Sequence, residues 1–216
     1  GLKRYDVPLL ANMSAGSVDE FAWMAETLAV DGIAGLEVNV SCPNVECEGM
    51  AFGVDPKVVE AVTKAVRAKT NKPVIIKLSP NVTDIAEIAR ACEAGGADGV
   101  SLINTLLGMA IDPRTRRPIL GNTYGGFSGP AVKPVALRMV HQVSKAVKIP
   151  IIGLGGIMTG SDAAEFMLAG ASAVQVGTAT MIDPRAIGRI ARELDHYCQE
   201  QGFESVSQLT GALIVD

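Results

Sequence analysis

The segment Gly95-Gly96-Ala97-Asp98-Gly99-Val100-Ser101-Leu102-Ile103-Asn104 decides the fold class of this chain. Its first half consists of small residues, which is typical of a point where a helix stops and the chain re-enters a sheet. Its second half is a short β-rich run that ends on a polar amide. Similar small-residue turns occur at residues 31–35 and 170–173. The repetition predicts a parallel (β/α) barrel in preference to an open sheet.

Short β-rich runs alternate with amphipathic helical segments along the whole chain, which is the pattern of parallel βα units. Six runs are expected to be strands, at residues 7–12, 36–40, 74–78, 100–104, 149–153 and 173–176. A complete barrel of this type has eight strands and roughly 250 residues. We therefore expect a single domain over residues 1–216, a (β/α)8 TIM barrel with about six of its eight βα units present and its N-terminal part missing.

Signals for the start of a helix recur between the strands. Ser17 with Glu20 forms a candidate capping box, and Asp55-Pro56 supplies an N-cap followed by a proline at the first helical position. Asp183-Pro184 repeats that device. The longest irregular piece, residues 105–130, contains scattered glycines and prolines, and we interpret it as a lid over the site.

Composition excludes several classes of protein. The 216 residues carry a formal net charge of -4, so a broad cationic surface for nucleic acid or anionic lipid is not expected. No apolar stretch is long enough to span a bilayer, and the N-terminus has no signal-peptide core, which favours a cytoplasmic location. Four cysteines form no disulfide framework, and the two histidines have no metal-ligand spacing with a cysteine, so no metal site is expected.

Polar residues and glycines follow each expected strand. The carboxyl ends of barrel strands meet on one face, where the reactive groups of such enzymes lie. A single polar residue at a strand end is best explained as a solvated loop position, but six in succession favour a site. The strand-end positions are Asn12, residues 39–44, Lys77, Asn104-Thr105, Gly155-Gly156 and Gly177-Thr178.

The hexapeptide Asn39-Val40-Ser41-Cys42-Pro43-Asn44 places a thiol between two carboxamides. A thiol can accept a proton after modest tuning of its pKa, and carboxamides can orient a planar polar substrate. Most cysteines are merely small buried residues, but the polar and loop-forming neighbours of Cys42 argue against core packing. We assign no catalytic role to Cys47, which is flanked by two glutamates, or to Cys92, which falls on the core face of an expected helix.

Two glycine turns close the last two strands, and their backbone amides form a plausible phosphate cradle. Lys77 ends an otherwise apolar strand, where a lysine is uncommon unless it is paired or functional. It can stabilise an electron-rich ring, or attack a carbonyl as a Schiff-base amine, or simply extend to solvent. The residues alone leave these alternatives open.

Several separated motifs resemble one known family, the class 1 dihydroorotate dehydrogenases, and most closely its B subtype. The resemblance runs from about residue 7 to the C-terminus. The motifs are Asn39-Val-Ser-Cys-Pro-Asn44, Lys77-Leu-Ser-Pro-Asn81, Ile103-Asn-Thr-Leu-Leu-Gly108, Ser128-Gly-Pro-Ala-Val-Lys-Pro134, Gly153-Leu-Gly-Gly156 and Val176-Gly-Thr178. The resemblance implies a flavoprotein that uses FMN to oxidise dihydroorotate to orotate in pyrimidine biosynthesis.

The resemblance also implies roles for individual residues. Cys42 is similar to the general base that removes a proton from C5 of the substrate, and Lys77 to the lysine beside the flavin ring. The substrate-binding groups implied are Asn39, Asn44, Asn104 and Thr105. The FMN contacts implied are Asn12, Asn39, Lys77, Ile103, Gly129, Gly155, Gly156, Gly177 and Thr178, with the last four at the phosphate.

For the B subtype, the resemblance implies a second subunit that carries FAD and an iron–sulfur cluster, in a heterotetramer built around a catalytic homodimer. The N-terminal portion of the family has no counterpart in this sequence, so we expect this exact chain to be impaired. Three alternatives are kept: a related flavoenzyme that oxidises dihydropyrimidines, an aldolase or lyase barrel that forms a Schiff base on Lys77, and a truncated barrel without catalytic activity.

Overall fold

The computed structural model describes residues 7–41 and 52–215. Within them, six parallel strands form one curled sheet in the order β1-β2-β3-β4-β9-β10. The strands are β1 (Leu10–Met13), β2 (Gly35–Asn39), β3 (Val74–Lys77), β4 (Gly99–Leu102), β9 (Ile151–Leu154) and β10 (Ala173–Gln175). This arrangement confirms the predicted partial TIM barrel, and all six expected strands are present.

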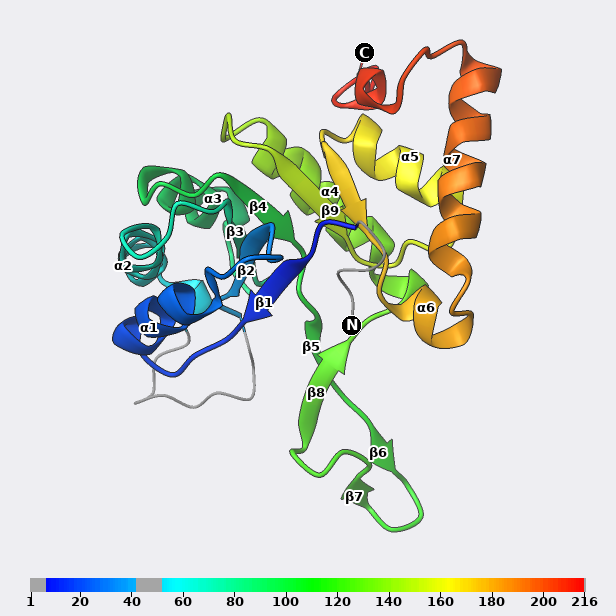
Figure 1. Cartoon of the computed structure of the whole chain (residues 1–216). Helices are drawn as coiled ribbons and strands as arrows, with labels where there is room; N and C mark the ends of the chain where they lie inside the picture. Colours follow the sequence, from blue (N-terminus) through cyan, green and yellow to red (C-terminus); the bar gives the residue numbers. More distant parts are fainter. Residues whose placement is uncertain (1–6, 42–51, 216) are drawn as a thin grey trace.

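Helices cover the outer face of the sheet (Figure 1). They are α1 (Val18–Leu28), α2 (Pro56–Arg67), α3 (Ile85–Ala94), α4 (Lys133–Ser144), α5 (Gly160–Leu168), α6 (Thr178–Ile182) and α7 (Ala186–Gln201), with short 3-10 turns η2 (Phe52–Val54), η3 (Pro130–Val132) and η4 (Val206–Leu209). Helices α1 to α5 pack each against the next, and α7 packs against α5. The core lies between sheet and helices and includes Phe21, Ile76 and Phe166. Cys92 is fully buried there, as predicted, and burial raises the pKa of its thiol.

Local sequence signals explain most of the element boundaries. Gly32, Gly96 and Gly170 occupy the helix-to-strand turns with positive φ values of 90°, 89° and 119°, which glycine adopts without a steric penalty. The Asp55 side chain accepts a hydrogen bond from the Lys57 N–H and Pro56 is the first residue of α2, as predicted.

Two predicted helix starts are only partly correct. The Ser17 hydroxyl accepts from the Glu20 N–H, but the Glu20 carboxylate accepts from the Gly16 N–H, so the reciprocal bond of a capping box is absent from this turn. Asp183 accepts from the Arg185 N–H, and α7 begins only at Ala186, because the turn after α6 separates Asp183-Pro184 from the helix.

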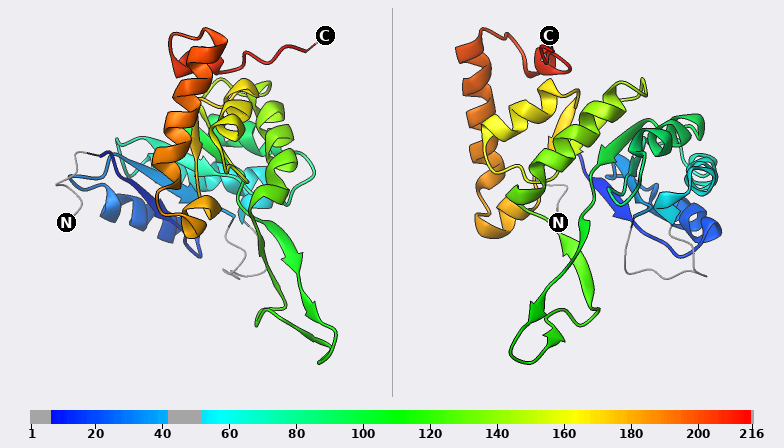
Figure 2. Two further views of the ribbon diagram at one scale, coloured as in Figure 1. Left: turned by 90° about the vertical axis from the view of Figure 1, so that its right-hand side faces the viewer. Right: turned by 180° about the vertical axis from the view of Figure 1, so that it is seen from behind.

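The prediction of an irregular lid at residues 105–130 is wrong. The segment forms an antiparallel arm in which β5 (Leu106–Met109) pairs with β8 (Tyr124–Phe127), and β6 (Ile111–Asp112) pairs with β7 (Arg117–Pro118). The arm projects away from the barrel in every view (Figure 2). Glycines that resemble loop residues in the sequence lie within β8, where Gly126 leaves space for the Thr105 side chain.

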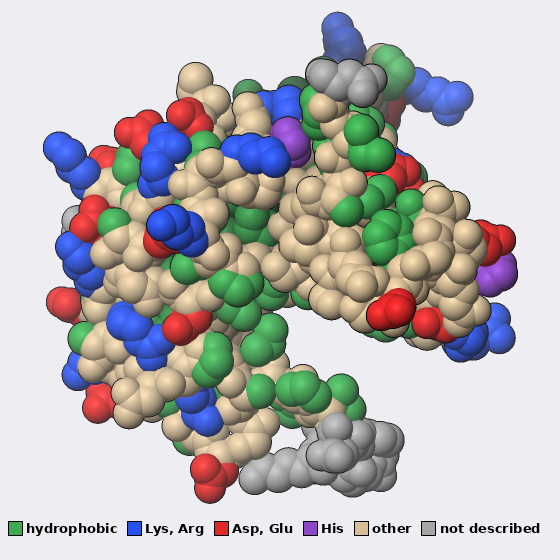
Figure 3. Space-filling model, turned by 90° about the horizontal axis from the view of Figure 1, so that it is seen from above, with side chains coloured by type: hydrophobic (Ala, Val, Ile, Leu, Met, Phe, Trp, Pro, Cys, Tyr) green, Lys and Arg blue, Asp and Glu red, His purple; other side chains and the backbone are tan. Residues whose placement is uncertain are grey.

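The sheet is open between its two outermost strands, β1 and β10, within the described residues. Leu10 in β1 is 44% exposed, whereas Leu36 in the neighbouring β2 is completely buried. Seen from above, the molecule has a deep notch on one side (Figure 3). The interior of the barrel is therefore accessible from this side.

Candidate active site

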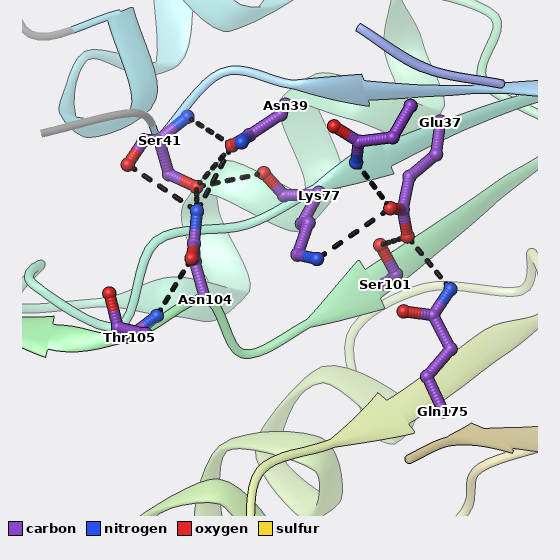
Figure 4. A network of polar contacts seen from close by, with 9 residues as sticks. Glu37, Asn39, Ser41, Lys77, Ser101, Asn104, Thr105 and Gln175 are labelled. Carbon is purple, nitrogen blue, oxygen red and sulfur yellow. Dashed lines mark hydrogen bonds and ion pairs between the residues drawn. The ribbon is translucent and has the colours of Figure 1, made fainter. Parts of the chain in front are cut away.

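Three of the strand ends bring polar side chains together on one face, as the sequence predicts (Figure 4). The Asn104 side-chain amide donates to Asn39 Oδ1 at 3.0 Å and to Ser41 Oγ at 2.6 Å. Asn39 Oδ1 also accepts from the backbone N–H and the hydroxyl of Ser41. The Thr105 N–H donates to Asn104 Oδ1 at 2.8 Å. These bonds fix the orientation of both carboxamides.

The same bonds show which polar groups remain available to a ligand. Within residues 7–41 and 52–215, no hydrogen bond uses the Asn39 side-chain nitrogen or the Thr105 hydroxyl. Asn39 is half-buried at the end of β2, next to Lys77 at the end of β3. The site thus offers an amide donor, a hydroxyl and an ammonium side by side.

Glu37 is the centre of a second network, deeper in the barrel (Figure 4). Its carboxylate is 7% exposed and lies 3.6 Å from the Lys77 ammonium. It accepts hydrogen bonds from Asn12 at 2.5 Å, Ser101 at 2.7 Å and Gln175 at 2.9 Å. Burial by itself raises the pKa of Glu37, but the charge of Lys77 and these donors outweigh it, so the pKa lies below its usual value. Glu37 is an ionised carboxylate inside the barrel.

A pocket lies beside these networks and encloses about 720 Å³, counting its open mouth. It is bounded by β3, the segment after β4, the base of the arm and the turns that follow β9 and β10. The residues around it include nine of those predicted for the site: Lys77, Ile103, Asn104, Thr105, Gly129, Gly155, Gly156, Gly177 and Thr178. Gln175 also lines it.

The glycine turns have the shape of a cradle. Gly155 and Gly156 have φ values of 125° and 84°, and a Cβ on Gly156 would lie 2.8 Å from the Gly129 carbonyl oxygen. At Gly177 the situation is reversed, because a Cβ there would meet no atom of the described residues within 4 Å. The wall is thus closely packed at Gly156 and open at Gly177. An open cradle of backbone amides at the start of α6 is suited to a phosphate group.

Ion pairs next to the glycine turns, outside the pocket, stabilise the cradle. The Lys133 ammonium lies 2.6 Å from Asp162 Oδ1 and 2.9 Å from Glu165 Oε1, which joins the start of α4 to α5. Hydrogen bonds to Asp162 and Glu165 raise the pKa of Lys133. The second oxygen of Asp162 accepts from the Met158 and Thr159 N–H groups, which completes a capping box with Thr159.

Some predicted site residues lie elsewhere. Asn12 is on the outermost strand β1, and its side-chain nitrogen is bonded to Glu37. Cys42 and Asn44 lie outside the described residues. Their predicted roles, like all the predicted roles at this site, are taken up below as proposals.

Glu37, Ser101 and Gln175 were not predicted to belong to the site. The signal was present, since each is a polar residue within an otherwise apolar strand: Gly-Leu-Glu37-Val, Val-Ser101-Leu and Ala-Val-Gln175-Val. A parallel strand covered on both faces should read as a continuous apolar run, so a charged residue within it requires a buried partner.

The fold and the pocket together define a class of protein, a (β/α)-barrel enzyme. Its polar groups and glycine turns gather at the carboxyl ends of the strands, where the active sites of such barrels lie. No helix in the described part of the chain has the length and apolarity needed to cross a membrane.

Comparison with known proteins gives the family. Residues 2–198 match the family model of dihydroorotate dehydrogenase. The chain is 59% identical to the dihydroorotate dehydrogenase B (NAD(+)) catalytic subunit of Geobacter metallireducens over 215 residues, which cover 99% of this chain and 70% of that protein. For the subunit of the same name from Desulforamulus reducens, the identity is 58% over 211 residues, 97% of this chain and 69% of that protein. The chain belongs to the dihydroorotate dehydrogenase family and is an oxidoreductase.

Proposed function

We propose that this protein oxidises dihydroorotate to orotate in pyrimidine biosynthesis with FMN as its cofactor. The observation that carries the proposal is the pocket itself, in which the oriented Asn104 carboxamide, the Lys77 ammonium and two glycine turns lie around one space. The family relationship supports the same reaction, since the relatives carry its name. We also propose a cytoplasmic location.

The substrate-binding groups proposed are Asn39, Asn44, Asn104 and Thr105. Dihydroorotate carries ring carbonyls, ring N–H groups and a carboxylate. Amide nitrogens and hydroxyls donate to oxygens of this kind, and amide oxygens accept from N–H groups. The amide nitrogen of Asn39 and the hydroxyl of Thr105, which make no hydrogen bond within the described residues, are suited to carboxylate or carbonyl oxygens. Asn104, besides binding the substrate, holds Asn39 and Ser41 in place.

Cys42 is proposed as the general base. Its thiolate removes the proton from C5, and the electron pair of that C–H bond forms the C5–C6 double bond of orotate. FMN, when bound, supplies the chemistry of accepting the hydride that leaves C6. Cys42 directly follows Ser41, which Asn104 binds, and this continuity of the chain supports a position near the substrate.

The cofactor contacts proposed are Asn12, Asn39, Lys77, Ile103, Gly129, Gly155, Gly156, Gly177 and Thr178. The last four are proposed at the phosphate, because they line the pocket at the ends of β9 and β10, where the cradle is open at Gly177. Lys77 places a positive charge in the pocket wall, which favours an electron-rich ring.

A visible spectrum of the purified protein, followed by addition of dihydroorotate without oxygen, tests cofactor and substrate together. The proposal predicts a flavin spectrum that bleaches on addition of dihydroorotate. It also predicts that Cys42→Ser slows this bleaching at least about a hundredfold near neutral pH, whereas Cys47→Ser does not. A yellow protein that dihydroorotate leaves oxidised contradicts the proposal, whereas a colourless protein is the result that the expected impairment of this exact chain predicts. A yellow, reducible protein would refute the impairment expected for this exact chain.

We further propose that the protein forms a homodimer and joins a subunit with FAD and an iron–sulfur cluster. The names of the relatives, which call them catalytic subunits, support a partner. The arm supports an association surface, since large apolar side chains such as Leu107, Ile119 and Tyr124 are 56%, 64% and 56% exposed.

The alternatives receive less support. A Schiff-base lysine attacks a carbonyl with its side-chain nitrogen, but the Lys77 nitrogen is paired with the Glu37 carboxylate 3.6 Å away. The family match also favours a dehydrogenase over a lyase. No observation on the described residues favours a different dihydropyrimidine or a non-catalytic barrel.

A further inference from the structure

Glu37 is a buried charge that the proposed reaction does not use. Each of its two oxygens has two partners: Ser101 and Gln175 at Oε1, Asn12 and Lys77 at Oε2. Burying a carboxylate is costly even when it is paired, and apolar residues of similar size often serve stability equally well. Its presence inside the barrel therefore requires a reason besides packing.

The partners of Glu37 suggest that reason, because two of them line the pocket. Lys77 and Gln175 come from β3 and β10, which are not neighbours in the sheet, and both contact the one carboxylate of β2. The remaining partners, Asn12 and Ser101, do not line the pocket. Glu37 thus connects two separate walls of the pocket from beneath.

The contact also sets the direction of the Gln175 amide. Its nitrogen donates to Glu37 at 2.9 Å, so its carbonyl oxygen points away from the carboxylate (Figure 4). Within the described residues, that oxygen accepts from no donor. The pocket floor therefore presents a cation at Lys77 and a hydrogen-bond acceptor at Gln175.

We propose that Glu37 is a positioning residue, which holds the Lys77 ammonium and the Gln175 carboxamide so that the pocket floor recognises a ring edge with an electron-rich oxygen beside an N–H group. This inference rests on the proposed function, because the pyrimidine edge of a flavin has that chemistry. Glu37 itself does not touch the ligand.

The test compares Glu37→Gln, which has the same shape without the charge, with Ser101→Ala. Ser101 donates to the same carboxylate, is completely buried and is not in the pocket wall, so it is the matched control. The first measurement uses flavin-free protein. Acetic anhydride modifies amines that it can reach, and mass spectrometry gives the acetylation rate of Lys77 relative to the exposed Lys64. This ratio should rise about tenfold in Glu37→Gln, because the Lys77 side chain is then no longer held by the charge of a carboxylate 3.6 Å away. It should not change in Ser101→Ala.

The second measurement titrates each protein with oxidised and with reduced FMN. Loss of the negative charge beneath the ring favours the electron-rich reduced form. The ratio of the dissociation constant for oxidised FMN to that for reduced FMN should therefore rise about tenfold in Glu37→Gln. A merely structural role of Glu37 would lower the melting temperature but leave both ratios at the wild-type values, and that result would overturn the proposal.

The test still gives a result if Glu37→Gln does not fold or if the wild-type chain does not bind FMN. If Glu37→Gln does not fold, Glu37→Asp replaces it, because the shorter side chain keeps the charge but moves it away from Lys77. Both ratios should then rise about threefold, and unchanged ratios overturn the proposal. If the wild-type chain binds no FMN, the expected impairment of this chain is borne out, and the acetylation ratio still decides whether Glu37 positions Lys77.

Discussion

The Asn104 amide nitrogen donates to Asn39 Oδ1 over 3.0 Å and so joins the ends of two strands that are not adjacent in the sheet, β2 and β4. Asn104→Asp replaces this donor by a carboxylate oxygen, which repels Asn39 Oδ1 and no longer holds the Ser41 hydroxyl in the same way. We expect kcat/KM for dihydroorotate to fall roughly 30- to 100-fold, the equivalent of about 2–3 kcal/mol. Steady-state kinetics on the purified variant provide the measurement.

The control for this variant is Asn122→Asp, the same chemical change at an exposed turn of the arm. It should leave kcat/KM within about twofold of the wild-type value. Equal losses in the two variants would mean that added negative charge, and not the contact between strand ends, is responsible.

Gly177→Ala tests the phosphate cradle without disturbing the fold. Within the described part of the chain, the new methyl group at the start of α6 would meet no atom within 4 Å. We therefore expect FMN to bind at least about tenfold more weakly, because the methyl group occupies space that the phosphate needs, while the melting temperature stays unchanged. Fluorescence titration of flavin-free protein with FMN measures the affinity.

Gly188→Ala, on the exposed side of α7, is the control and should retain full affinity. Undiminished binding by Gly177→Ala would place the phosphate elsewhere.

Gly156→Ala should lower the stability of the fold, which Gly177→Ala leaves unchanged. Gly156 has a φ of 84°, and a Cβ would lie 2.8 Å from the Gly129 carbonyl oxygen and 2.9 Å from Lys133 Cβ. Both the backbone conformation and the contact with backbone atoms oppose a side chain, so we expect a loss of about 2–4 kcal/mol in the free energy of unfolding. Urea denaturation of flavin-free protein measures it. A loss below about 0.5 kcal/mol would show that the turn relaxes easily.

Asp162 should make stability depend on pH in the acid range. Burial by itself raises its pKa, but the Lys133 ammonium and the Met158 and Thr159 N–H groups lower it below the usual value. A group whose pKa is lower in the folded state stabilises the fold above its unfolded pKa of about 4, and this contribution disappears as the pH falls through the folded-state pKa. Asp162→Asn should therefore cost about 1–2 kcal/mol at pH 7. Its difference from the wild type should shrink steadily below about pH 4. If the difference in unfolding free energy between Asp162→Asn and the wild type were the same at pH 7 and below about pH 4, ionisation of Asp162 would not be its cause.

The six strands and the pocket residues at their ends were predictable from the sequence, whereas the Glu37 network and the arm were not. Small-residue turns and apolar runs predicted all six strands, because these signals are local and act within a few residues. The pocket residues at strand ends were also predictable, since parallel strands place their ends on one face. The Glu37 network was not predicted, because its members come from five strands and meet only through tertiary packing. Likewise, the pairing of β5 with β8 depends on contacts between residues up to about twenty positions apart, and glycines conceal it.

The exposed apolar side chains of the arm give a final prediction, on association. Ile111 and Ile119 are 56% and 64% exposed near the tip, and burial of large aliphatic side chains in an interface would contribute about 1–2 kcal/mol each. Replacing both by serine should therefore weaken self-association at least about tenfold, as measured by analytical ultracentrifugation. Val30→Ser, which changes a residue with 54% exposure just after α1, is the control and should associate like the wild type. Because the arm forms its own two-stranded sheets and projects from the barrel, the double variant should keep the wild-type melting temperature. Unchanged association of the double variant would mean that the arm faces a different partner or none.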